Sequence, residues 1–327
     1  MVLLAAIATA PVACIAPSPE PAPDAGVLIG LSVHVEGWRT EVRDRDQYEA
    51  HVANLETLAA AAEAHDAVLT FELGPTFVEA TAAWGGGDLL ASFADRGHTI
   101  AVHADVGGDP EQFATTDEFT AELVAQRAAV EALVPGIEVT HVTGICSADP
   151  WVEAALAAGF ETTAGLVEYC AMSLDPADLP EGVTQDCASP VACHGEPPRA
   201  YDQTSWVWWA DSSAHWLTPA DDGLLLVAGG GAGPVCASEA ASGVTVGAEG
   251  CTGDDEDLAL TSDALADGTD DLDADHTSVV WFTWSVGTPV DEEYAEEWFS
   301  MVERSTADGS LTWSSPTEVL AAARANG

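Results

Sequence analysis

The stretch GLSVHVEGWRTE, residues 30–41, has the apolar pattern of a buried strand but also carries ionisable side chains of the kind that bind a metal ion. Its apolar residues predict a strand that ends at Gly37, and side chains two positions apart on a strand point to the same side. His34 and Glu36 therefore share one side of an otherwise apolar strand. Burying two ionisable groups is costly unless something binds them. A metal ion would satisfy them, and so would a plain hydrogen bond between the two side chains.

The segments that follow this strand alternate between strand and helix patterns. Strand-like runs such as AVLTFEL and IEVTHVTGI are separated by Ala-rich segments with helical spacing. Residues 115–136 begin with Thr-Thr-Asp and end at Pro-Gly, which are boundary signals of a helix. Repeated strand–helix units imply a parallel sheet with right-handed crossovers. This regularity favours an α/β fold, a closed barrel rather than an open sheet, in one domain over residues 27–327.

Polar side chains gather where the predicted strands end. The first strand ends in His34 and Glu36, the second in Glu72, and the third in His103 and Asp105. The carboxyl ends of parallel strands lie at one edge of the sheet, where function gathers in barrels and open sheets alike. We therefore expect a metal or catalytic site at this edge, shared by His34, Glu36 and His103.

The charge of the chain excludes several classes of partner. The formal net charge is -47, from 55 acidic and 8 basic residues, and every basic residue is arginine. Such a chain repels nucleic acid and anionic lipid surfaces, so neither is an expected partner. The charge suits a solvated surface in salty surroundings, where self-repulsion is screened. The most acidic segment, residues 254–276, predicts an exposed excursion between two strands.

The first residues have the pattern of an export signal. Residues 1–14 contain a short apolar run that is too short to span a bilayer. They end in PVAC, which resembles a degenerate bacterial lipobox and predicts lipidation of Cys14. The alternative is an ordinary signal peptide with an incidental cysteine. The Pro-rich residues 15–26 predict a flexible tether. We therefore expect an exported protein, either a cell-envelope lipoprotein, which contacts the membrane only through its lipid anchor, or a secreted protein.

The cysteines agree with export. Without Cys14 the chain has an even number of cysteines, which an oxidising compartment would join into disulfides. Cys236 and Cys251 lie on either side of a Gly-rich segment and would staple it if they paired. The spacing leaves the pairing of all six open: Cys146, Cys170, Cys187, Cys193, Cys236 and Cys251.

Three of these segments resemble motifs of the polysaccharide deacetylases, the NodB-like carbohydrate esterases. FADRGHTIAVHAD, residues 93–105, is similar to their second motif, with matches at Gly97, His98, Ile100 and His103. VLTFELG and SVHVEGW resemble the second strand and the first motif of the family. The resemblance implies a distorted (β/α)7 barrel of the glycoside hydrolase/deacetylase type. It also implies a divalent metal, often zinc, that activates water to remove an acetyl group from an amino sugar.

The resemblance also suggests roles for individual residues. Glu36 and His103 stand where the family places a metal carboxylate and its first metal histidine, and His34 stands at the position of the catalytic base. The second metal histidine would fall at Gly107, so Asp105 or Asp109 would replace it. The family's Arg-Pro-Pro-Tyr motif is absent around TGICSADP, and its final histidine is replaced near Trp284.

We therefore predict a metal-dependent hydrolase, with Glu36, His103 and Asp105 as metal ligands and His34 and Glu72 as catalytic groups. Its expected partner is a polysaccharide or oligosaccharide, and its expected cofactor is a divalent metal, zinc in particular. The alternative is a noncatalytic surface lipoprotein that binds glycan with the same barrel.

Aromatic residues suggest where a sugar would lie, because aromatic faces stack on pyranose rings. Residues 205–216, SWVWWADSSAHW, contain four tryptophans that could line a groove: Trp206, Trp208, Trp209 and Trp216. Alternation puts Trp206 and Trp208 on one side of a strand, and they are the predicted substrate contacts. Core packing explains at least two of the four equally well. His141 is internal to an apolar strand and is interpreted as a hydrogen-bonded core histidine.

Overall fold

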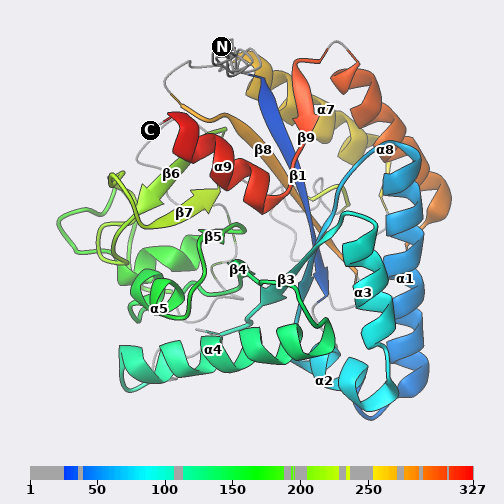
Figure 1. Cartoon of the computed structure of the whole chain (residues 1–327). Helices are drawn as coiled ribbons and strands as arrows, with labels where there is room; N and C mark the ends of the chain where they lie inside the picture. Colours follow the sequence, from blue (N-terminus) through cyan, green and yellow to red (C-terminus); the bar gives the residue numbers. More distant parts are fainter. Residues whose placement is uncertain are drawn as a thin grey trace, which may run out of the picture.

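The computed structural model describes residues 26–35, 40–106, 113–187, 193, 195, 205–227, 233–235, 253–270, 276–286, 290–307 and 309–326. Within these ranges, strands and helices alternate along most of the chain (Figure 1). The strands are β1 (Val27–Val35), β2 (Thr70–Leu73), β3 (Thr99–His103), β4 (His141–Thr143), β5 (Thr162–Thr163), β6 (Val207–Ala210), β7 (Leu224–Val227), β8 (Val279–Ser285) and β9 (Leu311–Trp313).

The strands form one curled sheet in the order β6-β7-β5-β4-β3-β2-β1-β8, with β9 beside β1. The path from β8 through β1, β2, β3, β4 and β5 to β7 is parallel throughout, and β6 runs antiparallel to β7. The two edges of the sheet meet at an isolated bridge between Trp206 and Ser278. There the amide of Val279 donates to the carbonyl of Ser205 at 2.7 Å. The predicted fold, a distorted (β/α)7 barrel in a single domain, is confirmed.

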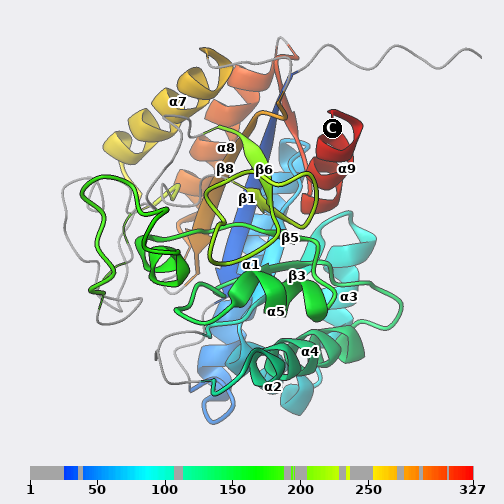
Figure 2. The same cartoon turned by 90° about the vertical axis from the view of Figure 1, so that its left-hand side faces the viewer.

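Helices surround this sheet. In Figure 2, β1 stands in the middle, with α7 and α8 on one side and α9 on the other. No helix in the described ranges is long and apolar enough to span a membrane. The helices are α1 (Arg45–Ala64), α2 (Pro75–Trp84), α3 (Gly87–Asp95), α4 (Thr116–Leu133), α5 (Trp151–Ala157), the 3-10 helix η1 (Glu168–Ser173), α7 (Asp255–Asp270), α8 (Glu292–Thr306) and α9 (Pro316–Asn326).

Strand β1 shows how the barrel separates an apolar layer from a polar interior. Its odd-numbered residues, from Val27 to Val35, are fully buried in the core between sheet and helices. Its even-numbered residues point to the other side, where Gly30 leaves room for the ring of Trp281. A Cβ on Gly30 would lie 1.9 Å from that ring. The tryptophan therefore fills the barrel beneath Ser32 and His34.

The acidic segment between β7 and β8 differs from the prediction. Residues Asp255–Asp270 form helix α7, which packs on α8 and β8, rather than an exposed excursion. Thr261, Leu265 and Gly268 are buried at helical spacing, so one side of the helix faces the core. The acidic residues dominate the composition of this segment and conceal its sparse apolar stripe.

Candidate functional site

Three strands bring their polar side chains to one point inside the barrel. In the parallel register His34 of β1 lies beside Glu72 of β2, and Glu72 lies beside Ala101 of β3. His103 follows two residues later on β3, on the same side of the sheet. The ligand atoms of His34, Glu72 and His103 all lie within 4.8 Å of one another. Residues far apart in the chain thus form one compact group of two imidazoles and a carboxylate.

Glu72 is the centre of this group. Its side chain is fully buried, and both carboxylate oxygens have partners. Oε1 accepts from the hydroxyl of Ser32 and lies 3.1 Å from Nε2 of His141. Oε2 accepts from the hydroxyl of Thr143 at 2.8 Å and lies 2.5 Å from Nε2 of His34. We call these five residues, with His103, the Glu72 network.

The charge of Glu72 follows from these contacts. Burial opposes ionisation of the carboxyl group, but the neighbouring His34 and His141 outweigh that effect and hold the pKa of Glu72 below its ordinary value. Glu72 is therefore an ionised carboxylate in the barrel interior. A buried carboxylate needs a nearby positive charge or a full set of donors to be tolerated. Its partners here are imidazoles and hydroxyls, and neither arginine nor lysine is among them.

A second layer of contacts orients the network. Nδ1 of His141 lies 2.8 Å from the hydroxyl of Thr162, and Nδ1 of His103 lies 2.9 Å from the hydroxyl of Thr143. The indole of Trp281 donates to the hydroxyl of Ser32 at 2.8 Å. Such outer contacts fix ring orientation and ligand basicity in metal sites. The site is therefore preorganised by the strands that form it.

Close packing surrounds the two histidines at the mouth of the network. The rings of His34 and His103 lie 4.5 Å apart between centroids. Gly144 follows β4 with φ at +66°, a conformation that favours glycine. A Cβ there would lie 2.9 Å from Cε1 of His103 and 2.9 Å from the amide nitrogen of Asp105. Only glycine lets the chain turn so close to His103.

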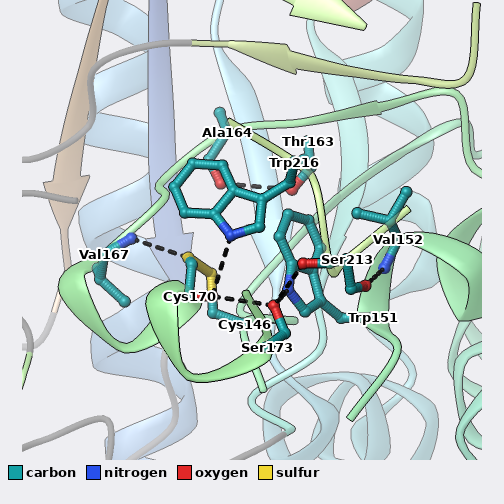
Figure 3. The surroundings of a disulfide bond; sticks show 10 residues. All are labelled: Cys146, Trp151, Val152, Thr163, Ala164, Val167, Cys170, Ser173, Ser213 and Trp216. Carbon is teal, nitrogen blue, oxygen red and sulfur yellow. Dashed lines mark hydrogen bonds between the residues drawn. A yellow bond between two sulfur atoms is a disulfide. The ribbon is translucent and has the colours of Figure 1, made fainter. Parts of the chain in front are cut away.

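A disulfide connects the loops that leave the same edge of the sheet. Figure 3 shows Cys146, which follows β4, bonded to Cys170 in η1, which follows β5. The fully buried Trp216 donates its indole N–H to the carbonyl of Cys170 at 3.1 Å, so the loop after β6 is joined to the same cluster. A second disulfide joins Cys187 to Cys193. The expected disulfides are thus present where the structure describes both cysteines.

The other predicted site residues fall in different places. Glu36 and Asp109 lie outside the described residues, as does Cys14. Asp105 is exposed, with φ at +47°, and does not belong to the group formed by His34, Glu72 and His103.

The two predicted sugar contacts are both half-buried and packed on neighbours. The ring of Trp206 stacks on His276 with centroids 3.8 Å apart. Trp208 donates its indole N–H to the carbonyl of Trp216 at 2.7 Å. These contacts account for part of each ring, and the role of both tryptophans in binding stays a prediction.

Sequence reasoning overlooked the contribution of β4. His141 is a buried, hydrogen-bonded histidine, as interpreted, but its contact with Glu72 was not predicted. Nor was the contribution of Thr143, which bonds to both Glu72 and His103. A signal was available, because polar residues recur at every second position of β1 and β4: Ser32 and His34, and His141 and Thr143. This period of two, on two strands of the same sheet, indicates a polar barrel interior.

Comparisons with known proteins agree on the architecture. No protein-family model matches the sequence, and no curated protein is similar to it. A solved structure assigned as a polysaccharide deacetylase, from Mycobacterium smegmatis, superposes with a TM-score of 0.55 at 13% identity, over 94% of this chain and 93% of that one. The chain has the deacetylase fold.

Two further solved structures show the same architecture. A Parabacteroides distasonis protein assigned as a glycoside hydrolase/deacetylase superposes with a TM-score of 0.54 at 12% identity, over 88% of this chain and 69% of that one. The allantoinase PuuE gives 0.53 at 11% identity, over 91% of both chains.

Proposed function

We propose that this protein is a divergent polysaccharide deacetylase, a metal-dependent hydrolase that removes acetyl groups from an amino-sugar polysaccharide. The observation that carries the proposal is the convergence of His34, Glu72 and His103 inside a barrel of the deacetylase fold. Hydrolytic metal sites use this kind of donor set, with protein ligands on one side and an open position for water.

The residues present fit a divalent metal such as zinc. Two imidazoles and one carboxylate are the donor set of several catalytic zinc sites. Glu72 is ionised and oriented by Ser32 and Thr143, as a ligating carboxylate usually is. His34, Glu72 and His103 would hold the ion, and Glu36 or Asp105 would add a ligand from the mouth of the barrel. A bound ion would lower the pKa of a coordinated water and so supply the nucleophile.

Where Glu36 or Asp105 completes the ligand set in place of His34, the imidazole of His34 is suited to exchange protons with substrate, because its nitrogen is then not bound to the ion. Its side chain is 12% exposed, whereas those of Glu72 and His141 are fully or almost fully buried. A side chain at the edge of the pocket can pass a proton to a reacting atom, whereas a side chain buried away from the substrate cannot. Glu72 and His141 then position His34 from below rather than acting on the substrate.

One observation favours a second candidate, a barrel that binds glycan without catalysis. Each oxygen of Glu72 already has two partners, so the carboxylate is satisfied without an ion. In that case the Glu72 network is a polar core, and the tryptophans Trp206 and Trp208 would contact the sugar.

Metal content separates the two candidates. We expect the purified chain to bind about one zinc ion by elemental analysis, as three protein ligands of one site imply. His103→Ala should abolish binding, whereas His215→Ala, which alters a surface histidine paired with Asp178, should leave it unchanged. The deacetylase should release acetate from an acetylated chitooligosaccharide, and chelation should stop the release. A metal-free chain that binds glycan would contradict the proposal.

We also propose that the protein is exported and anchored through Cys14. The disulfides Cys146–Cys170 and Cys187–Cys193 support export, since such bonds persist in oxidising compartments. Labelling of cells with a radioactive fatty acid should mark the wild-type chain and not the Cys14→Ser variant. Labelling of both, or of neither, would contradict the anchor.

A further inference from the structure

A cleft of about 780 Å³ lies at the amino-terminal ends of β4, β5 and β7. None of its lining residues belongs to the Glu72 network, although Thr140 of the lining directly precedes His141 of the network. In barrels this end usually serves stability rather than function. The walls of the cleft nevertheless carry an aromatic ring and charged groups of both signs, notably Trp209, Arg127, Arg324, Asp221 and Asp222.

The aromatic wall is Trp209, on the side of β6 that faces away from Trp208. Trp208 packs with the main core, whereas Trp209 packs with Val207 and the smaller core beneath α9. Trp209 is only half-buried, and its indole N–H has no acceptor among the described residues. Trp209 thus contributes an aromatic ring to the wall of the cleft, and its indole N–H is available to a hydrogen-bond acceptor.

Arg127 forms a fixed part of the wall of the cleft. Its guanidinium donates to the carbonyls of Ala158 and Gly159 at 3.0 Å each and to Glu131 at 2.9 Å. A Cβ on Gly159 would lie 2.2 Å from the guanidinium, so a glycine is needed for this close approach. The charge of Arg127 is therefore used within the protein, and the same holds for Arg324, which pairs with Glu161 at 2.8 Å.

Asp221 and Asp222 supply the charge that is not neutralised. They lie in the turn before β7, where Gly223 has φ at +136° and passes close to the carbonyl of Ala210. Both carboxylates are exposed, and neither has a hydrogen-bond or ion-pair partner in the described ranges. A tight turn thus holds two adjacent unpaired carboxylates beside a tryptophan face.

We propose that this cleft binds a glycan that carries free amino groups. Its unpaired charge is negative, which disfavours phosphate, sulfate and uronic acid ligands. A tryptophan face takes the apolar side of a pyranose ring and attracts a cation, and the two carboxylates accept from an ammonium group and its neighbouring hydroxyls. The proposal concerns residues that the Glu72 network does not use, so it stands or falls independently of the metal site.

Calorimetric titration of the full chain tests this inference. The titration is done with a chelator, which stops turnover at the proposed metal site. At mildly acidic pH and low salt, a glucosamine tetramer should bind the cleft, and the N-acetylglucosamine tetramer should bind it at least about tenfold more weakly, because it lacks the charge that the carboxylates recognise. Trp209→Ala should weaken binding by about tenfold, and Trp209→Phe, which keeps an aromatic face, by less. The double variant Asp221→Asn/Asp222→Asn should lose the preference for the amine.

A matched control separates a built site from general attraction to an acidic protein. Asp263→Asn/Asp267→Asn removes the same charge from exposed positions of α7, far from the cleft in sequence. It should leave the affinity for the glucosamine tetramer unchanged. Equal binding of both tetramers, or an equal loss in the α7 variant, would overturn the proposal. Circular dichroism of each variant verifies that it is folded.

Discussion

The two ends of the barrel handle charge in opposite ways. At the carboxyl end of β1, β2 and β3, Glu72 is sealed from solvent and its two oxygens are fully partnered. At the amino end of β4, β5 and β7, Asp221 and Asp222 are exposed and have no partner among the described residues. Electrostatic interactions are strong and insensitive to salt when buried, and weak and screened when exposed. The first end is built to orient groups, and the second to attract a ligand.

Removing a carboxylate from each end is the strongest way to test this contrast. Glu72→Ala leaves His34, His141 and two hydroxyls buried without their acceptor and should lower the free energy of unfolding by about 3–5 kcal/mol. Glu161→Ala, at the other end, removes a half-exposed partner of Arg324 and should cost about 0–1 kcal/mol. Urea denaturation measures both. Similar costs for the two variants would contradict the difference between the ends.

A pair of glycines tests how tightly the carboxyl end is packed. Gly144 and Gly97 both have positive φ, but a Cβ on Gly97 meets nothing within 4 Å, whereas one on Gly144 meets His103 and the backbone of Asp105. Gly97→Ala should therefore show the cost of backbone strain alone. Gly144→Ala should cost about 1–3 kcal/mol more, since overpacking adds to that strain.

The same pair has a functional outcome. Gly144→Ala should weaken zinc binding, because the new methyl group displaces the His103 ring, and Gly97→Ala should not. Thermal melts and metal titration of the two variants provide the measurements. Equal behaviour of the variants would show that the loop after β4 yields without moving the histidine.

Much of the fold could be predicted from the sequence, because local patterns determine it. The alternation of apolar strands with capped helices predicted the barrel, and strand ends predicted that His34, Glu72 and His103 would approach one another. Helix α7 was missed because its buried residues are few and acidic residues dominate the composition of the segment. Burial of so sparse a stripe depends on the surfaces of α8 and β8, which are tertiary features.

The details of the site could not be predicted to the same extent. His141 lies 69 residues from Glu72, and its contact depends on how far the sheet curls. The role of Glu72 as the centre of a network, rather than a base at the rim, depends on the register of β1 against β2. Likewise, the alternation of side chains along a strand predicts that Trp208 and Trp209 lie on opposite sides of β6. It does not predict which of the two lines a cleft.

The response to pH gives the smallest and most specific test of the carboxyl end. The pKa of Glu72 is lowered in the folded protein from an ordinary value of 4.5. A carboxyl group of this kind contributes stability that is fully present above its unfolded pKa and is lost as the pH falls toward the folded one. The unfolding free energy of the wild type should exceed that of Glu72→Gln at neutral pH, and this difference should shrink below about pH 4.5, by up to about 1.4 kcal/mol per pH unit.

The control variant for this measurement must be less stable than the wild type and must keep every titrating group. Gly97→Ala meets that condition, since its substitution touches no side chain. Its difference from the wild type should stay constant over the same pH range, even though general protonation of an acidic surface changes the stability of both proteins. The difference in unfolding free energy between wild type and Glu72→Gln could also stay constant with pH. That result would mean that His34 and His141 do not stabilise the ionised carboxylate. The two ends of the barrel would then differ only in how deeply their carboxylates are buried.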